Sequence, residues 1–166
     1  MASIDELDVE ILERLRDDAR RGVVEIASDL RISRNTVHQR LKRLTDEGIL
    51  AGFIPHIDLA AIGLPVRANV SLELDQRRLR HVIEETARIP YVLEIKTQAG
   101  REDLLVEIAG STLEEIQKIA SLMVHIDGVR HTTTTLIVST PLPYRVGPIL
   151  RHVFSGSGWG RSTPLP

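Results

Sequence analysis

One basic, amphipathic stretch, residues 31–48, constrains the fold of this chain more than any other feature. Its apolar residues recur at helical spacing and predict a helix with one narrow buried stripe: Val37, Leu41 and Leu44. Ser33 occupies a favourable N-cap position, and Gly48 stands where a C-cap glycine is common. From Arg31 to Arg43 there are five basic residues and no acid. We interpret the stretch as a helix whose polar face meets DNA, although a solvated cationic helix has the same pattern.

The residues before this stretch favour the DNA interpretation. Ser3 and Glu6 have the spacing of a capping box, and an apolar stripe of Leu7, Ile11 and Leu15 predicts a helix that ends near Asp18. A second, short helix is expected at 23–30, followed by a three-residue turn at 31–33. A helix, a short helix, a tight turn and a basic helix together indicate a helix-turn-helix domain.

The polar side chains of the basic helix divide into two predicted groups. Those near its N-terminal end and on its polar face are candidates for base edges in the major groove: Arg34, Asn35, His38 and Gln39. Three further basic residues are candidates for phosphate contacts, which fix register without reading sequence: Arg40, Lys42 and Arg43. Ser33 and Thr36 complete the predicted DNA-binding set. A two-fold symmetric protein requires a pseudo-palindromic operator of double-stranded DNA.

The second half of the chain has the pattern of a different domain. Residues 66–74 alternate between apolar and polar side chains, which predicts a half-buried strand. Helical and strand patterns then follow in the order helix (76–88), strand (91–97), strand (103–109), helix (from about 112) and strand (129–139). This order is the ferredoxin-like βαββαβ pattern, so the expected fold class is α+β with a (winged) helix-turn-helix domain in front.

These patterns divide the chain into four segments. We expect a helix-turn-helix domain at 1–50, a linker with a short strand at 51–65, and a ferredoxin-like domain at 66–140. The tail at 141–166 is rich in Pro, Gly and Ser, and we expect its middle to dock and its end to be disordered.

Composition excludes several classes of function. The chain contains no cysteine, which excludes disulfides, thiolate metal sites and cysteine nucleophiles. Its six histidines lie in different predicted elements without the spacing of metal ligands, so we expect neither a metal nor a cofactor. There is no apolar run of membrane-spanning length and no signal-peptide pattern, so we expect a cytoplasmic protein without a membrane partner.

With both halves considered together, the chain resembles the Lrp/AsnC (feast/famine) family of transcriptional regulators. The resemblance covers about residues 4–139 and rests on LDVEILERLRDDAR, SRNTVHQRLKRLTDEGIL, the Gly52–Asp58–Gly63 pattern, the AGRED turn and GVRHTTTTLIV. It implies a DNA-binding head joined to an effector-sensing domain that dimerises through its sheet, with further assembly to tetramers or octamers. It also implies that the protein is not an enzyme.

The resemblance also implies a site for a small effector, most often an amino acid. The expected residues are Gly100, Arg101, Glu102, Asp103, Thr132 and Thr134. The family's turn usually reads Thr-Gly-x-aromatic-Asp, whereas here it reads Ala-Gly-Arg-Glu-Asp. The acidic Glu102 in place of an aromatic residue favours a polar or cationic ligand.

Three alternatives remain open from the sequence. Sirohaem decarboxylases share the two-domain plan, but their sensing domain carries an aromatic-rich run, and here residues 66–140 contain Tyr91 and no Phe or Trp. The altered turn is also compatible with an effector-independent regulator. An interaction module with a degenerate helix-turn-helix is disfavoured by the acid-free basic run.

Overall fold

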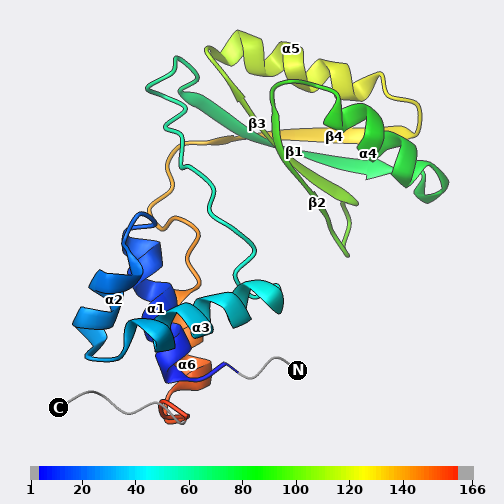
Figure 1. The fold of residues 1–166 in the computed structure, drawn as a ribbon. Coiled ribbons are helices and arrows are strands. Elements are labelled where there is room, and N and C mark those ends of the chain that lie inside the picture. Colours follow the sequence, from blue (N-terminus) through cyan, green and yellow to red (C-terminus); the bar gives the residue numbers. More distant parts are fainter. Residues whose placement is uncertain (1–3, 161–166) are drawn as a thin grey trace. The chain divides into compact units, whose positions relative to one another are not determined.

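The computed structural model describes residues 4–160, which form two compact units. Among the described residues, the first unit combines 4–55 with 143–160, and the second comprises 56–142 (Figure 1). The tail, which we expected to be a separate segment, is therefore grouped with the N-terminal helices. We call the first unit the head and the second the sensing domain.

Four helices build the head: α1 (Glu6–Asp17), α2 (Val23–Leu30), α3 (Arg34–Asp46) and, from the tail, α6 (Gly147–Phe154). Its core contains Leu7, Ile11 and Val37, which the helical spacing predicts, together with Ile26, and all four are fully buried. Helix α1 begins differently from our prediction. Its N-cap is Asp5, which forms a reciprocal capping box with Asp8, and Ser3 lies outside the described residues.

The segment after α3 forms no strand among the described residues, contrary to our expectation for 51–65. Gly48 adopts a left-handed φ of 71° just past α3, and the Leu50 N–H turns back to the Leu44 carbonyl. An extended segment becomes a strand only when a neighbouring strand pairs with it. Phe53 and Ile54 remain 57% and 93% exposed.

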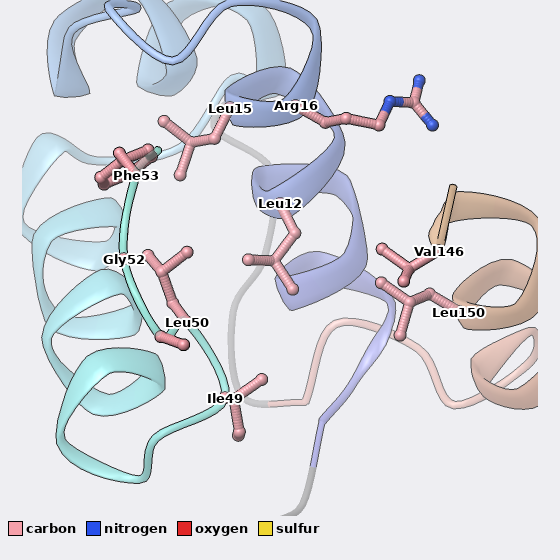
Figure 2. A pocket seen from close by; sticks show the side chains of 10 residues that line it. Leu12, Leu15, Arg16, Ile49, Leu50, Gly52, Phe53, Val146 and Leu150 are labelled. Carbon is pink, nitrogen blue, oxygen red and sulfur yellow. The ribbon is translucent and has the colours of Figure 1, made fainter. Parts of the chain in front are cut away.

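A cavity of about 410 Å³ lies between α1, the segment after α3 and the start of α6. Figure 2 shows its aliphatic lining, with Leu12 from α1, Ile49 from the segment after α3 and Leu150 from α6. The guanidinium of Arg16 points away from it (Figure 2). The tail therefore covers α1 only in part.

The sensing domain is a four-stranded antiparallel sheet in the order β2-β3-β1-β4 with two α-helices. The strands are β1 (Val66–Leu74), β2 (Val92–Thr97), β3 (Leu104–Gly110) and β4 (Val129–Ile137). A short 3-10 helix, η1 (Gln76–Arg78), precedes α4 (Leu79–Ala87), and α5 (Leu113–Val124) lies between β3 and β4. This order confirms the predicted ferredoxin-like fold.

Helices α4 and α5 cover one face of the sheet (Figure 1). The alternation predicted for β1 is present, since Ala68, Val70 and Leu72 are fully buried whereas the residues between them are partly exposed. The two edge strands, β2 and β4, contain no buried residue, and Leu136 of β4 is 44% exposed.

Candidate DNA interface

Helix α3 begins as the sequence predicts. The Ser33 hydroxyl accepts the Thr36 backbone N–H at 3.0 Å, and the two hydroxyls lie 2.8 Å apart. These two side chains therefore stabilise the first turn of α3. The preceding turn is tight because Arg31, at the end of α2, adopts a left-handed φ of 53°.

One face of α3 is open to solvent and carries most of the predicted DNA-binding residues. The exposed side chains follow helical spacing along this face: Arg34, Asn35, His38, Gln39 and Lys42. Lys42 is 68% exposed and pairs with Asp46 one turn further on, at 2.5 Å. A surface pair of this kind is weak and exchanges readily for a phosphate.

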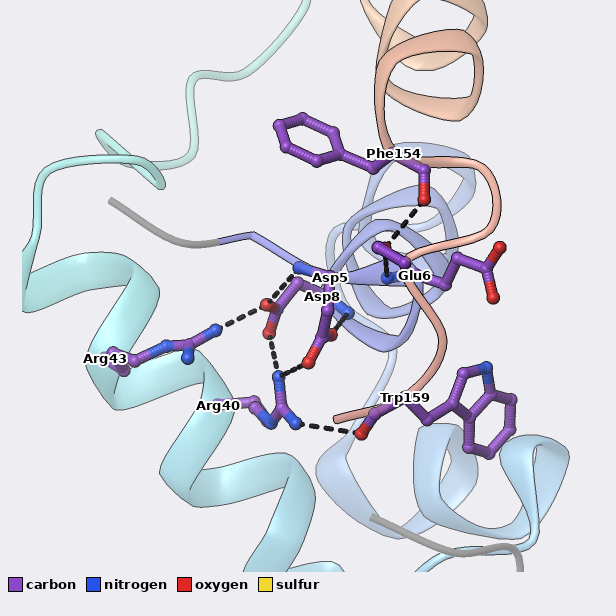
Figure 3. Close-up of polar contacts among 8 residues, drawn as sticks. Asp5, Glu6, Asp8, Arg40, Arg43, Phe154 and Trp159 are labelled. Carbon is purple, nitrogen blue, oxygen red and sulfur yellow. Dashed lines mark hydrogen bonds and ion pairs between the residues drawn. The ribbon is translucent and has the colours of Figure 1, made fainter. Parts of the chain in front are cut away.

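The other two predicted phosphate ligands, Arg40 and Arg43, lie on the inner side of α3. Arg40 donates to Asp5 at 2.6 Å and to Asp8 at 3.1 Å, and Arg43 also pairs with Asp8 (Figure 3). The carboxylate of Asp8 is fully buried between α1 and α3. Both arginines thus hold the two helices together, a role that our sequence analysis did not assign to them or to Asp8.

The opposite charges of Asp5, Asp8 and Arg40 shift the pKa values of Asp5 and Arg40 toward their charged forms. Burial by itself raises the pKa of Asp5, but the hydrogen bonds from Arg40 and from the Asp8 backbone outweigh burial, so this pKa lies below its usual value. Burial lowers the pKa of Arg40, yet the Asp5 hydrogen bond and the Asp8 charge raise it overall. Asp5 and Arg40 are therefore both charged at neutral pH.

The lowered pKa of Asp5 predicts that the head loses stability in acid. A depressed carboxyl pKa contributes stability that is present above about pH 4, where an unfolded Asp titrates, and that is lost as pH falls through the folded pKa. Asparagine is also a good N-cap, so Asp5→Asn removes mainly the charge. We expect this variant to melt below the wild type at about pH 7 and the difference to shrink below about pH 4. Fluorescence of Trp159, the only tryptophan, follows melting of the head, and a difference independent of pH would contradict the prediction.

The predicted effector residues lie on the sensing domain, and the structure brings some of them near one another. Asp103 accepts the Leu74 N–H at 2.7 Å and donates its own N–H to the Leu72 carbonyl at 2.8 Å. Thr132 pairs with Leu72 from the opposite side of β1, and Thr134 pairs with Val70. Asp103 therefore stabilises the end of β1. It lies about two strand spacings, or roughly 10 Å, from Thr132, because β1 separates them.

In the rest of the turn, Gly100 and Arg101 are open to solvent, whereas Glu102 is half-buried. Arg101 is 82% exposed and pairs with Glu73 at 3.2 Å. A Cβ built at Gly100 meets no atom within 4 Å, and its φ is not left-handed. Neither the space nor the backbone conformation of the single chain therefore requires a glycine at position 100.

Comparisons with known proteins identify both units. Residues 4–51 match a model described as winged helix-turn-helix DNA-binding, and residues 67–146 match one described as Lrp/AsnC ligand binding domain. The HTH-type transcriptional regulator AldR of Mycobacterium tuberculosis is 32% identical, over 82% of this chain and 78% of AldR. This chain belongs to the Lrp/AsnC family of transcriptional regulators.

Solved structures of similar fold agree with this assignment. The crystal structure of M. tuberculosis AldR covers 86% of this Lrp/AsnC chain and 96% of its own, at a TM-score of 0.68 and 30% identity. E. coli AsnC matches 89% of this chain and 100% of its own, with a TM-score of 0.82 and 21% identity. The regulator NMB0573 of Neisseria meningitidis, solved as a complex with L-Met, matches 91% of this chain and 99% of its own, at a TM-score of 0.82 and 18% identity.

The comparisons also decide between the classes of function left open by the sequence. The matched domains are regulatory and the curated relatives are named as regulators, so the chain is a DNA-binding regulator and not a decarboxylase. Within residues 4–160, no helix is long and apolar enough to cross a membrane. The same residues contain no cluster of His, Asp or Glu suited to a metal ion.

Proposed function

We propose that this Lrp/AsnC regulator reads a pseudo-palindromic operator with the exposed face of α3 and responds to a polar or cationic amino acid. The observation that carries the DNA part is the face formed by Arg34, Asn35, His38, Gln39 and Lys42. Arg34, Asn35, His38 and Gln39 are proposed for base edges and Lys42 for a phosphate. Ser33 and Thr36 set the helix start, and Arg40 and Arg43 support the helix from behind.

The proposed effector site lies at the 99–103 turn. Exposed Arg101 supplies a guanidinium for a carboxylate, and Glu102 supplies an acid for an ammonium or a cationic side chain. Strand β4, on the far side of β1, contributes Thr132 and Thr134, while Asp103 keeps the turn in place. The family description of this domain as ligand binding supports an effector, and the L-Met complex of the Neisseria regulator supports an amino acid.

We also propose that the chain works as a homodimer that assembles further, to a tetramer or octamer. Apolar side chains at and beyond β4 support a contact through the sheet, since Leu136 is 44% and Val138 96% exposed. A cytoplasmic location remains a prediction from the sequence.

Thermal shift against the common amino acids tests the effector proposal. A ligand that binds only the folded protein raises its melting temperature by mass action, by an amount that grows with ligand concentration. We expect a polar or cationic amino acid to do so and Arg101→Ala to abolish the shift.

Arg80→Ala is the matched control, because Arg80 is an equally exposed arginine, paired with Glu84 on α4. It should leave the shift unchanged. A shift that survives in Arg101→Ala would place the pocket elsewhere, and no shift at millimolar concentration would favour the effector-independent regulator.

A further inference from the structure

The part of the C-terminal tail from α6 onward packs on the DNA-binding head although it lies beyond both matched domains. The two family models end at residues 51 and 146, whereas α6 and the residues after it continue to 160. This segment nevertheless belongs to the compact unit that contains α1, α2 and α3. Its contacts differ between its two halves.

The first half, α6, is fixed to α1 by an ion pair and a close approach. Arg151 holds the carboxylate of Glu13 with contacts of 2.5 and 2.6 Å, and Glu13 is only 11% exposed. Gly147 is buried, and a Cβ there would lie 2.8 Å from Glu13 and 2.3 Å from Arg16. The ion pair and this glycine seat the helix on α1.

The second half, residues 155–160, winds around the N-terminus of α1. Gly156, Gly158 and Gly160 adopt left-handed φ values of 80°, 66° and 60°, which allow the repeated turns. The first backbone N–H of α1, at Glu6, donates to the Gly158 carbonyl at 3.1 Å and to the Ser157 hydroxyl at 3.0 Å. Helix N-termini leave such donors without intrahelical partners, so the tail satisfies one of them.

Trp159 connects this tail to the recognition helix α3. Its carbonyl accepts a hydrogen bond from the Arg40 guanidinium at 3.3 Å, while its indole points the other way (Figure 3). The indole packs against the apolar core of the head. A single residue thus contacts both the core and the arginine that ties α3 to Asp5 and Asp8.

We propose that the tail is a positioning element for the recognition helix and that Trp159 is its principal residue. The indole anchors residue 159 on the core, so that its carbonyl adds to the Asp5 and Asp8 contacts that hold Arg40 on the inner side of α3. The helix thereby keeps the orientation that aims Arg34 and His38 at base edges. Base contacts depend on this orientation, whereas contacts to phosphates tolerate small rotations. The inference rests on α3 being the helix that reads DNA.

Binding assays on full-length variants test the proposal. The specific probe is a duplex that the wild type selects from a randomised library, and the non-specific probe is a scrambled duplex of equal length and composition. We expect Trp159→Ala to reduce the ratio of specific to non-specific affinity by about tenfold while non-specific affinity stays unchanged. Tyr144→Ala, which removes a 94% exposed aromatic from the same tail, is the matched control and should change neither.

The outcomes distinguish the possible roles of the tail. If both affinities fall in proportion to the unfolded fraction seen by circular dichroism, the tail is merely structural and the proposal is overturned. If Arg34→Ala leaves the ratio of specific to non-specific affinity unchanged, α3 is not the helix that reads DNA. If Arg34→Ala lowers this ratio and Trp159→Ala does not, α3 reads DNA and only the tail proposal fails.

A second variant keeps the proposal testable should Trp159→Ala fail to fold. The methyl group of Gly158→Ala has open space, but the substitution strains a backbone with a φ of 66°. This variant retains the Trp159 indole as a fluorescent reporter. We expect increased acrylamide quenching of Trp159 together with a smaller fall in the affinity ratio. Increased quenching with an unchanged ratio would overturn the proposal.

Discussion

Asp8→Ala is expected to destabilise the head by about 3 kcal/mol or more, because removing one partner of a buried ion pair leaves its charges uncompensated. The Asp8 carboxylate is fully buried and is shared by Arg40 and Arg43. It also accepts the Asp5 backbone N–H at 3.0 Å, so the same substitution opens the capping box of α1. The ion pairs, the cap and the packing between α1 and α3 are therefore lost together.

Trp159 fluorescence during urea unfolding of the full chain measures this effect, because the only tryptophan packs on the core of the head. Asp17→Asn is the matched control. It removes a carboxylate from the same helix, but this carboxylate is 65% exposed and pairs with Arg16 at the surface, so the loss should stay below about 1 kcal/mol. Equal effects of the two substitutions would show that burial of Asp8 has no energetic role.

Asp8 also shows where sequence reasoning reached its limit. Ser33 as an N-cap and the alternation along β1 follow from local rules, and both are present in the structure. The partners of Asp8 lie 32 and 35 residues away, and no local pattern specifies such a pair. One signal was available for Arg40, which lies three residues after Val37 and four before Leu44, and therefore on the buried side of α3.

The middle of the tail docks as expected, since α6 packs on α1, and only the residues after it differ from the prediction. Residues 155–160, with Gly and Ser in alternation, favoured disorder, yet three left-handed glycines fit them around α1. Residues 161–166 lie outside the described part of the chain. The sensing domain was easier to predict, since each strand and helix there carries its own periodicity. The differences are small: the helix predicted at 76–88 starts as the 3-10 helix η1, α5 ends at Val124 before Gly128, and the strand ends shift slightly.

Because α3 has an exposed and an inner face, substitutions on its exposed face are expected to have a large effect on DNA affinity. Arg34→Ala is expected to cost roughly 1–3 kcal/mol at the selected duplex and little on scrambled DNA, because a guanidinium at a base edge provides discrimination between bases. Arg34 is exposed at the N-terminal end of α3, the end that reaches bases in helix-turn-helix complexes. Lys42→Ala, on the same face, should weaken both duplexes alike and reduce the salt slope by about one.

Titrations of both duplexes at several salt concentrations separate these two roles, and Arg88→Ala controls for the loss of one positive charge. Arg88 is 71% exposed on the sensing domain and pairs with Glu85, so its removal should alter neither the affinity nor the salt slope. Arg40→Ala should instead lower the melting temperature of the head, since Arg40 holds Asp5 and Asp8 from the inner side of α3. If Arg34→Ala and Lys42→Ala both bind every duplex like the wild type, the exposed face of α3 does not contact DNA, and the inner arginines would then support a helix with another partner.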